Sequence, residues 1–418
     1  MMIDPTPTRS TLLRLLTEAC ELEHGLACSY MFAAMSLRQE PLGAIFPPEK
    51  LPLARQWASQ IYFVASQEML HLAQAWNLVV ALGGSPYGLR PNFPQNTKYY
   101  PLHMRLALEP FGEAAIDRFI GYETPSDPLP EHAHFAAMTK SDDGDFRTIG
   151  ELYSLIERGI KALPNAIIGD PVDQAGPDLI DFPDIIRVVD VPSAVRAIQM
   201  ITHQGEGNQT DRADCHFGIF LKLRDELARE KTLNARFSPA YPAIENPSTD
   251  TSEEYGAPHA TLIENLETRA VARAFDGLYS LMLRMLTYAF TPRGEPCLKR
   301  AFGQLAILMM VTVLKPFGEA LVQMPARDLA HLRNAGPTFG LTRHVIFSAD
   351  PNAARILAAE RLAELAAEVA RLAALPGAPV CLARVDAALR RLSGFDLDAP
   401  LLNGPFQNAA GGGRRMPV

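Results

Sequence analysis

Apolar residues recur every three or four positions along most of this chain, which is the spacing that places them on one face of an α-helix. The first long run covers about residues 10–38, and the second covers about 53–82 and ends at Gly83-Gly84-Ser85-Pro86. Glycine followed by proline is typical of the end of a helix. Further runs cover about 111–121, 147–163 and 193–229, so the chain is predicted to be all-α with long loop connections.

The second half of the chain continues the helical pattern with a higher apolar content. Runs at about 259–290 and 295–322 are rich in methionine and leucine, a composition more typical of core packing than of a cofactor site. Two amphipathic runs follow at about 352–375 and 379–393. We expect four parts in chain order: a helical bundle over 1–231, a helical pair packed on it over 232–345, C-terminal amphipathic helices over 346–407, and a disordered tail over 408–418.

Composition narrows the class of protein. The 418 residues are 48% hydrophobic, which is ample for a large core, and the net charge of −8 offers no basic field for nucleic acid or an anionic membrane. Five scattered cysteines without a Cys-x-x-Cys pair fit a reducing compartment. No signal-peptide pattern opens the sequence, and the most apolar run is too short to span a bilayer. We expect a cytoplasmic protein without nucleic-acid or membrane partners.

The most informative polar residues lie in the middle of the second run. Glu68 and His71 are three positions apart, so both side chains leave the same face of a helix. The surrounding positions are apolar, and a charge in such a stripe is costly unless it is paired or bound to a metal ion. A carboxylate and an imidazole at this spacing can bind one metal ion, although the pair alone is a weak signal.

Two other predicted helices carry a glutamate beside an apolar stripe. Glu23 lies between Leu22 and Leu26, and Tyr30 follows two turns later on the same face. Glu151 has the same character in the run at about 147–163. These glutamates are candidate metal ligands, and Tyr30 is a candidate to donate a hydrogen bond or an electron. The alternative is that the glutamates make buried hydrogen bonds without a metal ion.

The last run of the first half contains Glu206 between two glycines. Gly205 and Gly207 each disfavour a regular helix, which is typical of a distortion near a functional site. A histidine partner for Glu206 could be His203, three positions before it, or His216, ten positions after it. On an ideal helix His216 is out of alignment by about 80°, which a distortion at the glycines could correct. We favour His216 and keep both.

Together these residues match the ligand set of a ferritin-like di-iron carboxylate bundle, in which four helices supply glutamates and two of them also supply a histidine. More narrowly, the chain resembles the ferritin-like domain of the iminophenyl-pyruvate dimer synthase family over about residues 10–340. The resemblance rests on Leu22-Glu23-His24, Tyr30-Met31-Phe32-Ala33-Ala34, Glu68-Met69-Leu70-His71-Leu72, Asn77-Leu78, Gly83-Gly84-Ser85-Pro86, Gly150-Glu151-Leu152-Tyr153, Gln204-Gly205-Glu206-Gly207, His216-Phe217 and Ala335-Gly336-Pro337-Thr338-Phe339.

This resemblance implies a ferritin-like four-helix bundle with additional C-terminal helices, from a family that takes part in assembling bisindole natural products. The first hypothesis is a di-metal oxidase or oxygenase that uses O2 on a small organic substrate, such as an amino-acid-derived imine. Its cofactor would be two iron ions, with manganese or a mixed pair as alternatives. The second hypothesis is an iron-handling protein without substrate turnover, and the third is a scaffold without metal. The amphipathic C-terminal helices could form a homo-oligomer contact or pack on the bundle.

Overall fold

The computed structural model of the protein describes residues 7–97, 100, 104–128, 130–132, 134–135, 146–180, 182, 184–205, 213–250, 259–292, 294–327, 333–341 and 346–393. Within these residues the fold is mostly helical, and the all-α prediction is confirmed. The predicted tail at 408–418 lies outside the described residues. The division into four parts stays a prediction.

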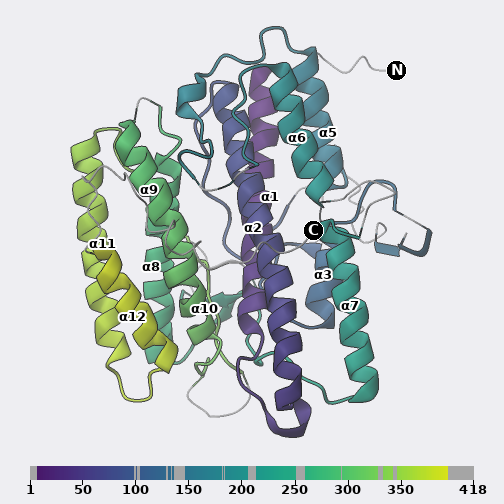
Figure 1. Ribbon diagram of the computed structural model, residues 1–418, viewed down its shortest axis with the longest axis vertical. Helices are drawn as coiled ribbons and strands as arrows, with labels where there is room; N and C mark the ends of the chain where they lie inside the picture. The colour runs from purple at the N-terminus through teal and green to yellow at the C-terminus, as the bar shows by residue number, and fades with distance from the viewer. Residues whose placement is uncertain are drawn as a thin grey trace, which may run out of the picture.

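Two long helices form the centre of the molecule (Figure 1). Helix α1 covers Arg9–Ser36 and begins with a hydrogen bond from the Thr11 backbone N–H to the Thr8 side chain. Helix α2 covers Leu51–Ala81 and ends before Gly83, whose positive φ of 87° favours glycine. The two helices pack along their length, and most of their residues are buried. They are therefore the fixed framework for any site between them and their neighbours.

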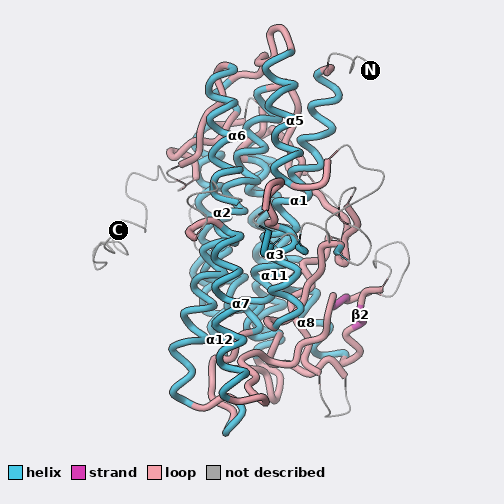
Figure 2. The backbone as a smooth tube through the Cα atoms, turned by 90° about the vertical axis from the view of Figure 1, so that its right-hand side faces the viewer, coloured by secondary structure: helices cyan, strands magenta, loops and turns pink. Residues whose placement is uncertain are grey.

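The third and fourth helices of the bundle are both interrupted. Helices α3 (Glu113–Tyr122) and α5 (Ile149–Ala162) take the place of the third, and α6 (Val191–Gly205) and α7 (His216–Leu233) take that of the fourth. Helices α5 and α6 pack together beside one half of the α1–α2 pair, and α3 and α7 pack together beside the other half (Figures 1 and 2). The end of α3, the end of α6 and the start of α7 therefore meet near the middle of the bundle.

The second half of the chain forms a helical layer on the other side of α1 and α2 (Figure 1). Helix α8 (Leu266–Tyr288) packs against α9 (Pro296–Met309), which continues through a π-helix at Met310–Leu314 into α10 (Lys315–Leu321). Helix α11 (Pro351–Ala373) packs on α8, and α12 (Val380–Ser393) packs on α10. The two C-terminal helices, α11 and α12, thus cover the layer formed by α8 and α10 of the same chain.

The remaining elements are short. Single 3₁₀ turns lie at Gly43–Ile45, Pro48–Lys50, Pro130–His132 and Pro171–Asp173, and strand β1 (Pro247–Ser248) pairs in parallel with β2 (Thr261–Leu262). The buried apolar side chains of both halves form one continuous core. One stretch, Pro296–Leu321, is long and apolar enough to cross a membrane, but 56% of its apolar window is buried inside the molecule. Core helices share these properties, so this stretch is weak evidence for a membrane.

Candidate metal centre

Five buried side chains meet where the interrupted helices face α1 and α2. Glu23 comes from α1, Glu68 and His71 from α2, Glu123 from the residue after α3, and His216 from the first turn of α7. Each of them is at most 4% exposed. They form two overlapping groups, Glu23–Glu68–His71 and Glu68–Glu123–His216, and in each group the potential ligand atoms lie within 4.8 Å of one another. Glu68 belongs to both groups.

The two oxygens of Glu68 face different histidines. Its Oε1 lies 2.7 Å from His216 Nδ1, and its Oε2 lies 3.3 Å from His71 Nδ1. The outer carboxylates complete the row, with Glu123 Oε2 3.6 Å from His216 Nδ1 and Glu23 Oε2 3.5 Å from His71 Nδ1. The arrangement is therefore symmetric about Glu68, with one imidazole and one further carboxylate on each side.

Two glutamines fix the orientation of the imidazole rings. His71 Nε2 lies 2.9 Å from Gln204 Oε1, and His216 Nε2 lies 3.0 Å from Gln67 Oε1. An amide oxygen only accepts hydrogen bonds, so each Nε2 carries a proton and donates it. The Nδ1 atoms are left for a proton or a metal ion. Among the described residues His216 Nδ1 has no well-directed hydrogen bond despite its short distance to Glu68. Once His216 loses its Nδ1 proton, the nitrogen lone pair and the carboxylates face one another across a position where a cation could bind.

Two tyrosines hold the outer carboxylates from behind. The Tyr153 hydroxyl on α5 donates to Glu23 Oε1 at 2.6 Å, and the Tyr30 hydroxyl on α1 donates to Glu123 Oε1. Each tyrosine uses the oxygen that does not face a histidine. Burial and the Glu123 carboxylate raise the pKa of Tyr30 well above its ordinary value, so its phenol stays protonated. The candidate catalytic residue Tyr30 therefore contacts the cluster through Glu123.

The charges in the centre are strongly coupled. Burial and the Glu68 carboxylate raise the pKa of Glu23 from its ordinary 4.5 to about 8. Burial acts in the same direction on Glu68, but His216 and His71 outweigh it and hold the pKa of Glu68 below its ordinary value. Burial lowers the pKa of His216, whereas Glu68 and Glu123 outweigh it and raise that pKa to about 9. Without a metal ion, bound protons neutralise the buried carboxylates, and a metal ion would replace them.

The structure brings together four of the seven metal ligands predicted from the sequence: Glu23, Glu68, His71 and His216. It does not bring Glu151 to them. Glu151 lies in the first turn of α5, where its Oε2 accepts a 2.6 Å hydrogen bond from the Arg147 backbone N–H. Glu151 stands three residues after the capping residue Thr148, whose hydroxyl accepts from the Glu151 backbone N–H, and its carboxylate reaches back to the residue before that cap.

The two other predicted ligands are His203 and Glu206. His203 is exposed on α6 and belongs to neither group. Glu206 lies outside the described residues. The preceding Gly205 ends α6 close to the cluster, since a Cβ there would lie 3.4 Å from Glu123 Oε2. A ligand role for Glu206 therefore stays a prediction.

Sequence reasoning missed Glu123, both glutamines and the contact made by Tyr153. Glu123 continues the buried stripe of α3, because it follows Ile116 by seven positions and Phe119 by four. The same apolar periodicity that marked Glu23 would have marked it. No comparable signal marks Gln67 and Gln204, because each is recognisable only by the ring that it contacts across the bundle.

Comparison with known proteins agrees with this fold. A family model described as ferritin-like matches residues 16–225, half of the chain, and that range includes all five clustered residues. The chain belongs to this ferritin-like family.

Two curated relatives resemble a larger part of the chain. Dichlorochromopyrrolate synthase of Lentzea aerocolonigenes is 26% identical over 415 residues, covering 89% of this chain and 40% of that protein. The 2-imino-3-(indol-3-yl)propanoate dimerase of Chromobacterium violaceum is 26% identical over 356 residues, covering 79% of this chain and 34% of that protein. The chain thus spans less than half the length of these relatives. They confirm the resemblance to the iminophenyl-pyruvate dimer synthase family.

A solved structure of a ferritin-like protein from Caulobacter vibrioides is 19% identical, with a TM-score of 0.46 over 68% of this chain and 87% of that chain.

The histidines of α6 and α7 allow a direct test of the cluster. His216→Ala is expected to weaken metal binding by about tenfold or more, because it removes a buried nitrogen that faces two carboxylates. His203→Ala should leave metal binding unchanged, because His203 is exposed. Metal titration of both purified variants against the unchanged protein measures this. Equal effects, or a larger effect of His203→Ala, would contradict the assignment of His216.

Proposed function

We propose that the cluster holds two metal ions, in the first place iron, and that the protein oxidises a small amino-acid-derived substrate with O2. The observation that carries the proposal is the position of Glu68, whose two oxygens face two separate groups of potential ligands. A carboxylate placed in this way can bridge two ions. Glu23 and His71 would hold one ion, and Glu123 and His216 would hold the other.

The donor set fits iron. Carboxylate oxygens and imidazole nitrogens suit iron and manganese, and the cluster contains no thiolate that would favour zinc or copper(I) among the described residues. When bound, two such ions supply O2 activation. The names of the two relatives, a synthase and a dimerase, support an enzyme that acts on small molecules. The dimerase is named for an indole-containing imino acid, which supports an imine as the substrate class for this chain.

The protein's own residues would prepare the site. Gln67 and Gln204 keep each imidazole turned with its Nδ1 toward the carboxylates. Tyr153 and Tyr30 donate protons in hydrogen bonds to the outer carboxylates and restrict their rotation. Phe119 and Phe220 pack around the Tyr30 ring, with centroids 4.7 and 4.9 Å away, and exclude water from its side of the cluster. Tyr30 would thereby be positioned to give a proton or an electron during oxidation.

Single-turnover oxidation tests the enzyme proposal. Protein loaded with ferrous iron without air should consume O2 when mixed with it, and the rate should change when an aromatic amino-acid-derived imine is present. Stopped-flow absorbance and an oxygen electrode measure both. Glu151→Gln should react like the unchanged protein, because it removes a glutamate that lies outside both groups of potential ligands. Iron binding with O2 consumption that is indifferent to every organic additive would overturn the enzyme and leave an iron-handling protein.

A further inference from the structure

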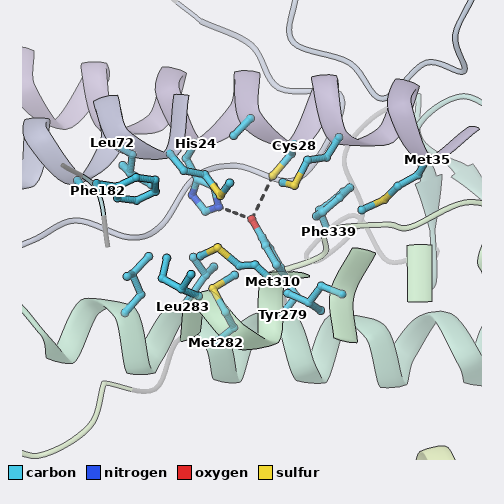
Figure 3. Close-up of a pocket in the computed structure, with 17 residues that line it drawn as sticks. His24, Cys28, Met35, Leu72, Phe182, Tyr279, Met282, Leu283, Met310 and Phe339 are labelled. Atoms are coloured by element: carbon cyan, nitrogen blue, oxygen red, sulfur yellow. Dashed lines mark hydrogen bonds between the residues drawn. The ribbon is translucent and has the colours of Figure 1, made fainter. Parts of the chain in front are cut away.

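An apolar pocket lies on the far side of α1 and α2 from the metal centre. It is enclosed by α1, α2, α8, α9 and the π-helix (Figure 3). His24 and Leu72 line it, each one residue after a member of the carboxylate cluster. One residue along a helix turns the side chain by about 100°, so the pocket and the cluster use different faces of the same two helices.

The pocket wall is apolar except at one end. Five methionines contribute to the wall, and the aromatic rings of Phe182, Phe339 and Tyr279 lie among them. Methionine side chains adapt to the shape of a guest, and their sulfur atoms make favourable contacts with aromatic rings. The cavity volume is about 40 Å³. That is roughly three times the space that one water molecule needs, and rotation of a methionine side chain would enlarge it.

The polar end of the pocket is a chain of hydrogen bonds that starts at a buried cation. Arg90, which is 5% exposed, approaches the Tyr279 hydroxyl with its Nη2 at 3.4 Å. The same hydroxyl contacts His24 Nε2, and it lies 3.1 Å from Cys28 Sγ (Figure 3). Arg90 only donates hydrogen bonds, so Tyr279 accepts from it and is polarised toward donating. An imidazole nitrogen is a stronger acceptor than a thiol, so the Tyr279 proton goes to His24 Nε2.

If the Tyr279 hydroxyl donates to His24 Nε2, the other ring nitrogen of His24 becomes a hydrogen-bond donor. When His24 Nε2 accepts, the neutral ring carries its proton on Nδ1. His24 Nδ1 is buried and has no hydrogen-bond partner among the described residues. In Figure 3 it lies on the side of the ring that faces Phe182. Buried polar groups are nearly always satisfied, so this N–H points to an acceptor atom that enters the pocket.

The π-helix is an independent sign of function at the same place. Such segments are rare, and they occur frequently at functional sites because they move side chains out of regular helical register. Here the segment Met310–Leu314 gives Met310 and Leu314 to the pocket wall. Val311, in the same segment, points away from the pocket and is 61% exposed.

From these observations we infer that the pocket binds a small aromatic molecule with a carbonyl-type acceptor, which receives a hydrogen bond from His24 Nδ1. The site is separate from the metal centre, and the inference does not depend on the proposed oxidation. The ring of the guest would lie among the methionines and phenylalanines, and its acceptor would extend the chain that begins at Arg90.

A matched pair of probes tests this inference. Acetophenone and α-methylstyrene have nearly the same shape, but only acetophenone carries a carbonyl oxygen. Ligand-observed NMR titration of the full-length protein should give a dissociation constant for acetophenone about tenfold lower than that for α-methylstyrene, which is the worth of one good hydrogen bond. His24→Phe should remove that difference. Equal binding of the two probes, or no binding of either and a water molecule only at His24, would overturn the inference.

Two variants that fill the pocket test whether acetophenone binds there. Leu283→Trp, which fills the pocket from α8, should weaken acetophenone binding by about tenfold or more. Met310→Phe fills the same space from the π-helix and keeps the test valid if the first variant does not fold. Val311→Ala on the exposed side of the π-helix is the control and should bind normally. Metal content should stay unchanged in Met310→Phe and Val311→Ala. Normal binding by the filled variants would place the probe elsewhere and overturn the assignment.

Discussion

Glu68→Gln is expected to remove metal ions from both positions of the centre, whereas Glu23→Gln should remove mainly one. The reason is that Glu68 offers an oxygen to each group of ligands, and Glu23 to only one. Glutamine keeps the shape of the side chain but lacks the negative charge that holds a cation. Elemental analysis of the purified variants after loading with ferrous iron measures the metal content per chain.

Two controls distinguish loss of metal ions from loss of the folded structure. Circular dichroism should show the same helix content in both variants, because the amide fills the same buried space. Glu151→Gln serves as the control of equal chemistry and should keep the full metal content, since Glu151 lies outside both groups. Glu68→Gln protein that still held two ions per chain would refute the shared role of Glu68.

The second large effect is that of pH on the metal-free protein, which should become less stable as the pH rises from about 6 to 9. The pKa of Glu23 rises from an ordinary 4.5 to about 8 on folding, and that of His216 from 6.5 to about 9. Both groups therefore bind protons more tightly in the folded state. The contribution of each group to the free energy of unfolding is fully present below its ordinary pKa. It is lost as the pH rises from that value through the pKa of the folded state. The loss should be about 2 kcal/mol or more in the free energy of unfolding.

Metal ions should act in the opposite direction. They take the place of the protons on Glu23, His71 and His216, so their binding strengthens with rising pH until these groups are deprotonated. Urea unfolding at several pH values, with and without iron or manganese, measures both effects. Glu23→Gln should flatten part of the pH dependence of the metal-free protein, because it has no carboxylate to deprotonate. Stability of the metal-free protein that increased between pH 6 and 9 would contradict the buried proton positions.

The sequence predicts the residues of α1 and α2 well because both helices are long, regular and buried on several sides. There Glu23, Glu68 and His71 interrupt periodic apolar stripes. Helical geometry places Glu68 beside His71, and the packing of α1 along α2 brings Glu23 to them. The interrupted helices are harder to predict. Glu123 stands at the end of α3 and Glu151 at the start of α5, on two sides of one long connection. Periodicity marks each of them as a candidate, but it cannot decide between them, because the break between α3 and α5 resets the helical phase.

In the second half of the chain, the sequence pattern does not reveal where a helix is distorted. The pattern at about 295–322 predicts one apolar helix, and the structure divides it by a π-helix whose residues line a pocket. A π-helix adds one residue to a turn without changing the composition of the segment. The methionine-rich pattern is likewise compatible with plain core packing. The hydrogen-bond chain that ends at His24 therefore becomes visible only when Arg90, Tyr279 and His24, far apart in the sequence, are seen in contact.

The interruption of the third and fourth helices also affects how such a protein can evolve. In a continuous helix a ligand is tied to every turn before and after it, so an insertion would rotate it away from the metal ions. Glu123 and His216 instead stand at helix ends beside connecting segments. Those segments can gain or lose residues while α1 and α2 keep three ligands fixed. One half of the centre thus rests on a rigid framework of two long helices, and the other half stands beside connections whose length can change without disturbing that framework.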